Sequence, residues 1–224
     1  MAGLVLSLRT AAIAGINPDR LWNAGLFLLL SAFVLSRLLL IVVYLHAFLT
    51  YPILLLAVPS LTPMGVLLTG LVTVLYLRVR RLPLLATLDA WAPCATLVWA
   101  FLALGHFAEG SDPGLVTALP WGRPMIAGGI PLHPVALYAA IVAVLLTMVL
   151  LGHLRRRQQR GDTAAFGLAA VGVAQFLLTF LRQPDPSAEM LGNVLDPIQW
   201  VAIGMIAAAG IIWLWPRKLV FDAV

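Results

Sequence analysis

Apolar runs of about 20 residues recur along the whole chain, separated by short polar or charged segments, a pattern typical of helices that cross a bilayer. Reading from one charge cluster to the next predicts six such helices, at residues 22–44, 62–79, 84–107, 134–152, 164–182 and 197–215. The alternating strands of a membrane barrel are not visible, so helices are the viable way to satisfy backbone groups in lipid.

Two further segments are apolar but too short to cross a bilayer, residues 1–14 and Tyr51–Pro59. We expect the second to lie at the membrane interface or to re-enter. Arg9 follows the apolar start of the chain instead of preceding it, which argues against a cleaved signal peptide. The pattern therefore predicts an all-α, polytopic membrane bundle with a short N-terminal segment, forming a single membrane domain over residues 1–224.

Composition excludes other classes of protein. The chain is 62% hydrophobic and 10% charged, whereas a soluble domain is about half apolar and a quarter charged. Its mean hydropathy of +1.02 also excludes disorder, which requires low hydrophobicity. Cys94 stands alone, so the chain has no internal disulfide or Cys-x-x-Cys site, and we expect a small apolar core residue there.

Basic residues gather at the ends of the predicted helices. With six spans, all these clusters fall on one face, which the positive-inside rule assigns to the cytoplasm together with both termini. Topology alone then explains the pI of about 10.1, and we reject a nucleic-acid partner. The clustered residues are Arg9, Arg20, Arg78, Arg80, Arg81, Arg155, Arg156, Arg157, Arg160, Arg217 and Lys218.

The opposite, outer face carries most of the carboxylates and three of the four histidines. If the protein performs chemistry, we expect it on this face. The polar residues there include His106, Glu109, Asp112, Arg123, His133, Arg182, Asp185, Glu189 and Asp196.

Several motifs on this face resemble the prolipoprotein diacylglyceryl transferase family. They are Leu119-Pro120-Trp121-Gly122, His133-Pro134-Val135-Ala136-Leu137-Tyr138, Arg182-Gln183-Pro184-Asp185 and Gln199-Trp200. Arg37, Asp89, Gly105, Phe107 and Gly110 also fall at matching places, and the resemblance runs from about residue 9 to 216. The order and spacing of the motifs together make the resemblance specific.

The resemblance implies an enzyme of the bacterial inner membrane that needs no cofactor. The family moves a diacylglyceryl group from phosphatidylglycerol to the lipobox cysteine of a lipoprotein precursor. Its members have seven helices, so we expect the first to be missing or reduced to residues 1–14 here. The family's polar site opens toward the outer face, in agreement with the charge pattern.

Some polar residues of the family are replaced in this sequence. The arginine expected to hold the phospholipid aligns with Ala103, and a family histidine aligns with Pro63. A family arginine and two glutamates fall on Gln175, Thr179 and Ala139. Two hypotheses therefore remain open, a divergent transferase and a catalytically silent relative that binds phospholipid or lipoprotein precursor.

The family reaction requires a cation for the departing phosphate and a base for the attacking thiol. The candidate lipid and phosphate ligands are Arg182, Arg123, Tyr138 and Asp185. The candidate catalytic residues are His106, His133 and Glu109.

The same residues have structural interpretations. Arg182 pairs with Asp185 at a helix end in one alternative, and His133 caps a helix start in another. We expect Arg37, Asp89 and Gln199 to be structural polar residues, the first two facing the bundle to find a partner. The histidines and carboxylates of the outer face lack a recognised ligand spacing, so no metal site is predicted.

Overall fold

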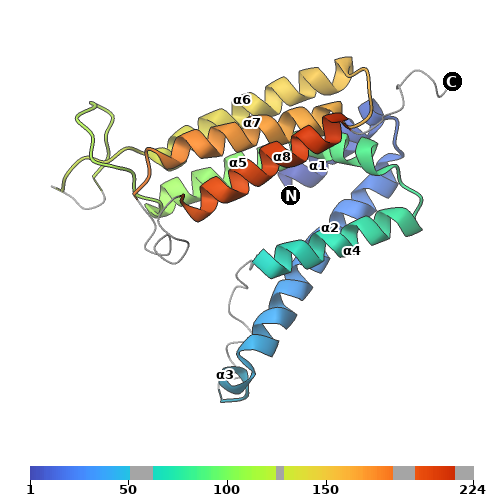
Figure 1. The fold of residues 1–224 in the computed structure, drawn as a ribbon, viewed down its shortest axis with the longest axis horizontal. Coiled ribbons are helices and arrows are strands. Elements are labelled where there is room, and N and C mark those ends of the chain that lie inside the picture. The colour runs from blue at the N-terminus through green and yellow to red at the C-terminus, as the bar shows by residue number, and fades with distance from the viewer. Residues whose placement is uncertain (51–62, 125–128, 184–194, 215–224) are drawn as a thin grey trace.

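The computed structural model describes residues 1–50, 63–124, 129–183 and 195–214. Within them all regular elements are helices, joined by turns and loops in which three isolated β-bridges pair Gly114 with Arg182, Val116 with Leu132, and Arg123 with Leu132. This confirms the all-α prediction for the described residues. The helices are α1 (Ala2–Ala14), α2 (Pro18–Val43), α3 (Leu45–Thr50), α4 (Pro63–Val79), α5 (Leu84–Glu109), α6 (Val135–Arg156), α7 (Asp162–Thr179) and α8 (Pro197–Leu214) (Figure 1).

Five of the described helices are long and apolar enough to cross a membrane, namely α2, α5, α6, α7 and α8. The remaining predicted span, residues 62–79, corresponds to α4. This helix has 17 residues, about 25 Å at 1.5 Å per residue, which is the short end of the range for a span. The expected short N-terminal segment is α1. The expected interfacial segment Tyr51–Pro59 lies outside the described residues.

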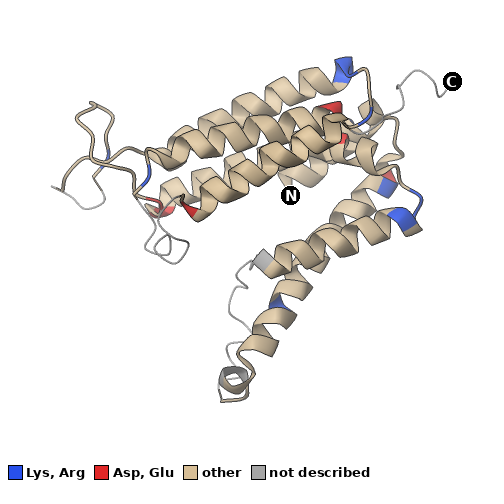
Figure 2. Ribbon diagram, in the orientation of Figure 1, with Lys and Arg blue, Asp and Glu red and all other residues tan. Residues whose placement is uncertain are grey.

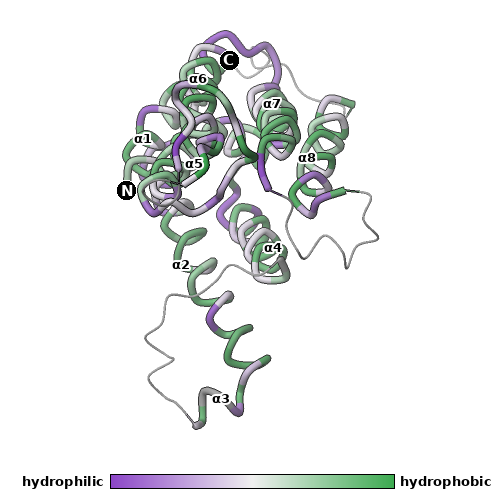
Figure 3. Tube along the Cα trace, turned by 90° about the vertical axis from the view of Figure 1, so that its left-hand side faces the viewer, coloured by the Kyte–Doolittle hydropathy of each residue, from purple (hydrophilic) through white to green (hydrophobic). Residues whose placement is uncertain are grey.

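The long helices form two groups. Helices α5 to α8 lie side by side, with α1 packed against α5, whereas α2 and α4 pack together and diverge from the others (Figures 1 and 3). Contacts between α1 and α2 provide most of the connection between the groups. In Figure 3 the helices are mostly hydrophobic along their length, and hydrophilic residues concentrate toward their ends.

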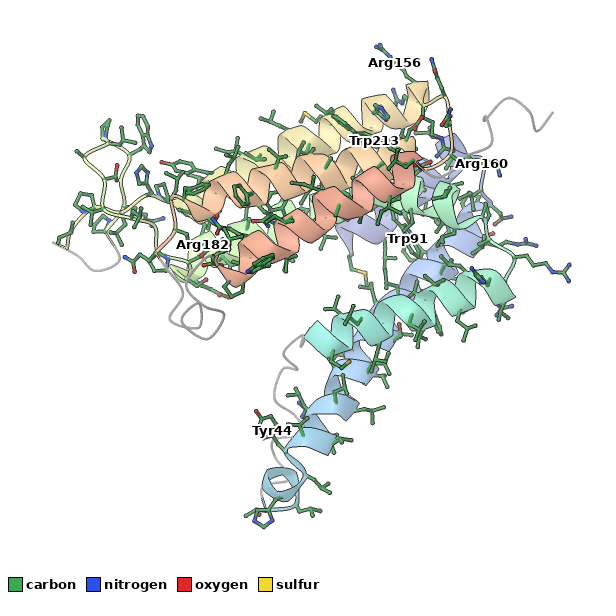
Figure 4. The ribbon with its side chains drawn as sticks, viewed as in Figure 1. Tyr44, Trp91, Arg156, Arg160, Arg182 and Trp213 are labelled. Carbon is green, nitrogen blue, oxygen red and sulfur yellow. The ribbon has the colours of Figure 1, made fainter. Side chains whose placement is uncertain are left out.

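We call α1 and α5 to α8 the main group. It has two opposite ends, the basic end and the loop end, and α2 and α4 also reach the basic end. The basic end comprises the last turns of α4 and α6, the first turns of α2, α5 and α7, and residues 80–83 and 157–161. The loop end comprises the last turns of α5 and α7, the first turns of α6 and α8, and the described parts of segment 110–134. Lys and Arg positions concentrate at the basic end (Figure 2). Figure 4 places Arg156 and Arg160 there and Arg182 at the loop end.

Local sequence signals fix the turn between α1 and α2. Gly15, with φ of 71°, ends α1 in the left-handed conformation that glycine adopts without strain. Asn17 then caps α2, because its side chain accepts hydrogen bonds from the amides of Asp19 and Arg20. Pro18 follows at the first helical position, where its missing N–H has no cost.

A buried ion pair joins three helices at the basic end. The Arg157 guanidinium lies 2.6 Å from an Asp89 carboxylate oxygen and donates a second bond to the Ala14 carbonyl at 3.0 Å. The amides of Gly161 and Ala164 donate to the same carboxylate at 2.7 and 2.9 Å. Asp89 therefore has the structural partner that its place in an apolar run led us to expect.

Arg157 lies with its basic cluster after α6, as the charge pattern predicted, but it also has a structural role that the pattern did not predict. Its side chain is 4% exposed and belongs to the interior. A buried guanidinium requires a counter-charge, and Asp89 supplies it from α5. The neighbouring Arg155 and Arg156 are exposed, as the charge pattern predicted.

Candidate functional site

Segment 110–134 is tied by its backbone to the end of α7. The amide of Leu115 donates to the Leu181 carbonyl at 2.8 Å, and the amide of Gln183 donates to the Pro113 carbonyl at 3.1 Å. The amide of His133 donates back to the Leu115 carbonyl at 2.9 Å. These bonds hold the start of α6 beside the end of α7, although the two lie about 50 residues apart in sequence.

Gly114 lies where segment 110–134 passes directly against the start of α6. A Cβ atom at this position would lie 2.3 Å from the His133 carbonyl oxygen and 2.9 Å from Cγ2 of Val135. Both distances are shorter than real Cβ contacts. Only glycine therefore allows residue 114 to lie directly against the start of α6.

Arg182 is held by a carboxylate from this segment. Its terminal nitrogen lies 2.6 Å from Oδ2 of Asp112, and each side chain is 21% exposed. The Nε of Arg182 is buried and has no hydrogen-bond acceptor among the described residues. One interpretation of the sequence paired Arg182 with Asp185. Asp185 lies outside the described residues, and the observed partner is Asp112.

The helix-opening motif and the Leu-Pro-Trp-Gly motif meet at one hydroxyl group. The Trp121 indole N–H donates to the Tyr138 hydroxyl at 2.8 Å. The same hydroxyl lies 3.5 Å from Nδ1 of His133, and the two rings pack edge to face. His133 is half-buried and is thus part of a polar cluster, not an isolated cap.

A cavity of about 280 Å³ opens beside these groups, and three of the predicted site residues line it. They are Glu109, Arg123 and His133, joined by Asp112. The Arg123 guanidinium lies over the Phe107 ring, 4.9 Å from its centre, which is cation–π geometry. The cavity therefore holds one cation, two carboxylates and an imidazole at the ends of α5 and α6.

Other predicted site residues lie outside this cavity. His106 is exposed, and its Nδ1 lies 2.9 Å from the Ser111 hydroxyl. Gln199 is buried at the start of α8 and donates to the Thr179 hydroxyl at 3.0 Å. Arg37 is half-buried on α2, and Asp89 lies at the basic end. Among the described residues no group of three His, Cys, Asp and Glu side chains is arranged to hold a metal ion.

Comparison with known proteins decides the family. Residues 1–215 match the family described as prolipoprotein diacylglyceryl transferase. The chain belongs to this family. The resemblance indicated by the motifs is therefore confirmed at the level of the family. Four of these motif residues, Trp121, His133, Tyr138 and Arg182, lie at the loop end.

The curated relatives are named for the substrates as well as for the transfer reaction. The phosphatidylglycerol–prolipoprotein diacylglyceryl transferase of Paracidovorax citrulli is 32% identical over 152 residues, which cover 64% of this chain and 55% of the relative. The protein of the same name from Polaromonas naphthalenivorans is 32% identical over 145 residues, covering 62% and 54%. The chain thus spans about half the length of the curated relatives it matches.

Two of the positions at which the resemblance implies a replaced charged residue lie in one place. Ala103 and Ala139 are both about 4% exposed and belong to one buried apolar cluster. Thr179, which aligns with another glutamate, accepts the hydrogen bond from Gln199. Small apolar packing thus occupies these two positions, and the charged groups of the candidate site lie around the cavity at the loop end. The cluster is completed by Val135, Ala140 and Leu178.

Sequence reasoning missed two residues of the site. Asp112 was noted as an outer-face carboxylate but not as the partner of Arg182, because nothing in the spacing links positions 70 residues apart. Trp121 was recognised as part of a motif but given no role. The residue is 58% exposed, so burial offered no signal that its indole N–H would find an acceptor.

Proposed function

We propose that this chain transfers the diacylglyceryl group of phosphatidylglycerol to the cysteine of a lipoprotein precursor. The observation that carries the proposal is the convergence of the family motifs on one site. Side-chain hydrogen bonds join Trp121, Tyr138 and His133, which come from two of the motifs. Backbone hydrogen bonds of Leu115 and Gln183 bring the end of α7, with Arg182 of the third motif, to the same loop end. The names of the curated relatives support the same substrates.

The chemistry requires two kinds of group. A thiol sulfur forms a bond to a glycerol carbon of the lipid while the bond from that carbon to a phosphate oxygen breaks, and glycerol phosphate departs. A guanidinium beside the phosphate stabilises the developing negative charge. A base accepts the thiol proton, and because a thiol has a pKa of about 8.5 the base need not be strong.

The loop end offers candidates for each role. Arg123 lines the cavity, and Arg182 pairs with Asp112 of the cavity wall in a partly exposed pair, so both can meet a lipid phosphate. Glu109 and His133 line the same cavity as Arg123, whereas His106 lies outside it on the last turn of α5. Tyr138 orients the cluster through Trp121 and His133.

This proposal places the protein in the bacterial cytoplasmic membrane. The basic end would lie in the cytoplasm, because clustered arginines are retained on that side. The loop end would then lie at the outer face, at a depth where a phospholipid headgroup and a secreted precursor can both approach. We propose no nucleic-acid partner.

A second candidate function has its own support. The apolar cluster around Ala103 and Ala139 removes a cation and a carboxylate from the interior, and losing one transition-state contact typically costs 10²–10³ in rate. A catalytically silent relative that holds phosphatidylglycerol or a lipoprotein precursor at the rim would retain what remains. The two candidates make different predictions in one assay.

The test is transfer by the purified full chain. The protein is mixed with acyl-labelled phosphatidylglycerol and a peptide carrying a lipobox cysteine, and mass spectrometry measures the thioether product. We expect product from the wild type and a loss of at least about 10²-fold in Arg123→Gln. Arg156→Gln, an exposed arginine at the basic end, is the matched control and should match the wild type.

The Paracidovorax citrulli relative serves as the positive control. If it yields product and this chain yields none, while this chain retains phosphatidylglycerol in a way that Arg123→Gln abolishes, the silent-relative candidate is correct. If this chain neither transfers nor retains the lipid in this way and does not bind the lipobox peptide, both candidates fail.

A further inference from the structure

A second and larger cavity lies at the basic end, away from the candidate site. Its volume is about 510 Å³, and it opens between the start of α2 and the end of α4. Its polar lining consists of Arg20, Asn23, Tyr76, Arg80 and Arg81. Three guanidinium groups, an amide and a phenol thus surround one space, and no carboxylate side chain lines it within the described part of the chain.

The positive charge of this cavity is not neutralised locally. The ion pairs at the two ends of the main group involve Arg157 and Arg182. Over the described residues, none of Arg20, Arg80 and Arg81 forms an ion pair, and all three are exposed. Three like charges around one concavity repel each other and attract an anion.

Arg81 occupies a backbone position that normally belongs to glycine. Helix α4 ends in a Schellman arrangement, in which the amide of Leu82 donates to the Leu77 carbonyl and the amide of Arg81 donates to the Arg78 carbonyl. Arg81 has φ of 53° in this arrangement. A side chain other than glycine or asparagine is uncommon there and is strained. The fold thus tolerates strain at the position that places a guanidinium in the cavity wall.

Aromatic packing orients a second arginine of the cavity. The Tyr76 ring stacks on Phe27 of α2 with 4.1 Å between ring centres, and the Arg80 guanidinium lies 5.6 Å from the centre of the Tyr76 ring. This packing joins α4 to α2 directly beneath the cavity. It also restricts the Arg80 side chain, so less conformational entropy is lost when Arg80 binds a ligand.

We propose that this cavity binds a phosphate group, carried by an anionic phospholipid or by a soluble phosphate ester. Guanidinium groups bind phosphate through paired, charge-assisted hydrogen bonds, and the volume suits a headgroup. The cavity lies where apolar α2 and α4 reach their basic ends, the depth of lipid headgroups, and basic pockets between membrane helices bind such headgroups. This site is separate from the loop end and does not rest on the proposed transfer activity.

General attraction of basic residues to an anionic surface is the alternative. It would treat Arg78 like its neighbours, because Arg78 is an exposed arginine on the last turn of α4. Arg78 does not line the cavity, however. Arg78 therefore provides a control that matches the cavity arginines in charge and in position along the membrane normal.

The test uses hydrogen–deuterium exchange of the full chain in phosphatidylcholine nanodiscs. Three conditions are compared: phosphatidylcholine alone, with added phosphatidylglycerol, and with soluble glycerol phosphate. We expect slower exchange in peptides covering residues 17–23 and 76–84. Protection by phosphatidylglycerol alone identifies a lipid ligand, whereas protection by glycerol phosphate as well identifies the phosphate group itself. Protection by neither probe would overturn the proposal.

Two variants separate binding from stability. Arg81→Gly relieves the left-handed strain, so its melting temperature should equal or exceed that of the wild type while the protection falls at least several-fold. Arg78→Gln should keep the wild-type protection. Equal losses in Arg78→Gln and Arg81→Gly would contradict a built site. Arg182→Gln should leave the basic-end protection intact, so a failure at the loop end is distinguishable from a failure here.

Discussion

Two arginine–aspartate pairs with equal spacing have different roles because their burial differs. Both pairs have a nitrogen–oxygen distance of 2.6 Å. The Arg157–Asp89 side chains are 4% and 0% exposed, whereas both side chains of the Arg182–Asp112 pair are 21% exposed. Breaking a buried pair leaves an uncompensated charge and is strongly destabilising, while a solvent-accessible pair contributes little. The first pair therefore holds the fold, and the second is free to exchange its partner for a ligand.

Replacing Arg157 should unfold the basic end. We expect Arg157→Gln to lower the free energy of unfolding by about 3–5 kcal/mol, because Asp89 then keeps only two backbone donors for a buried charge. Arg156→Gln removes the same charge from the adjacent exposed position and should change stability by less than about 0.5 kcal/mol. Denaturant unfolding in detergent micelles measures both. Similar values for the two variants would show that the pair does not stabilise the fold.

The sequence predicts these residues only in part. A carboxylate in an apolar run must find a partner, so the buried role of Asp89 follows from physics alone. Its partner does not, because Arg157 lies among four arginines that look alike in sequence. Choosing among them requires knowing where the chain turns after α6, which depends on tertiary packing.

At the scale of elements, the candidate site depends on backbone bonds more than on helices. The site lies at the ends of helices α5, α6, α7 and α8. Backbone hydrogen bonds of segment 110–134, made by the amides of Leu115, His133 and Gln183, hold the start of α6 beside the end of α7. Gly114 makes this possible by its close approach to His133. The site therefore has one critical residue that carries no functional group.

Adding one methyl group to Gly114 should disrupt the site. In Gly114→Ala the new Cβ would meet the His133 carbonyl, so segment 110–134 must move away from α6. We expect a loss of at least about tenfold in transfer or lipid retention, with the helical content unchanged by circular dichroism. Gly105→Ala is the control, because nothing lies within 4 Å of the added atom, and alanine is the better helix former. Full activity in Gly114→Ala would contradict the role of this contact.

Hydrophobic periodicity predicts the helices well and the connecting segments poorly. The six predicted spans correspond to α2 and α4 to α8, with ends within a few residues, because length and apolarity suffice to define a span. The bonds within segment 110–134 join residues with no periodic relation, such as Leu115 and Leu181. Sequence motifs marked its importance, but only the folded chain shows which residues meet.

At the scale of the whole molecule, charge separates the two ends. The basic end contains the exposed residues Arg20, Arg80 and Arg81 and the larger cavity, and the loop end contains histidines, carboxylates and the family motifs. The larger cavity lies between α2 and α4, and the smaller one lies at the ends of α5 and α6. Lys and Arg positions concentrate at the basic end (Figure 2). This polarity fixes the orientation that we expect in a membrane.

Orientation can be tested by cysteine labelling in intact cells. The only native cysteine, Cys94, is buried, so the wild type provides the blank. We expect Glu109→Cys at the loop end to react with a membrane-impermeant maleimide, and Gln158→Cys at the basic end to react only after permeabilisation. Both native residues are exposed, so access is limited by the membrane alone. The opposite labelling pattern would reverse the assignment.

The central claim is that the loop end holds the phosphate-bearing headgroup of phosphatidylglycerol. Photo-cross-linking tests it most directly, with a phosphatidylglycerol carrying a diazirine on its headgroup glycerol and with the modified peptides mapped by mass spectrometry. We expect labelling within residues 107–138, reduced at least several-fold in Arg182→Gln and unchanged in Arg156→Gln. Labelling that avoids residues 107–138, or that is unaffected by the loss of Arg182, would contradict it.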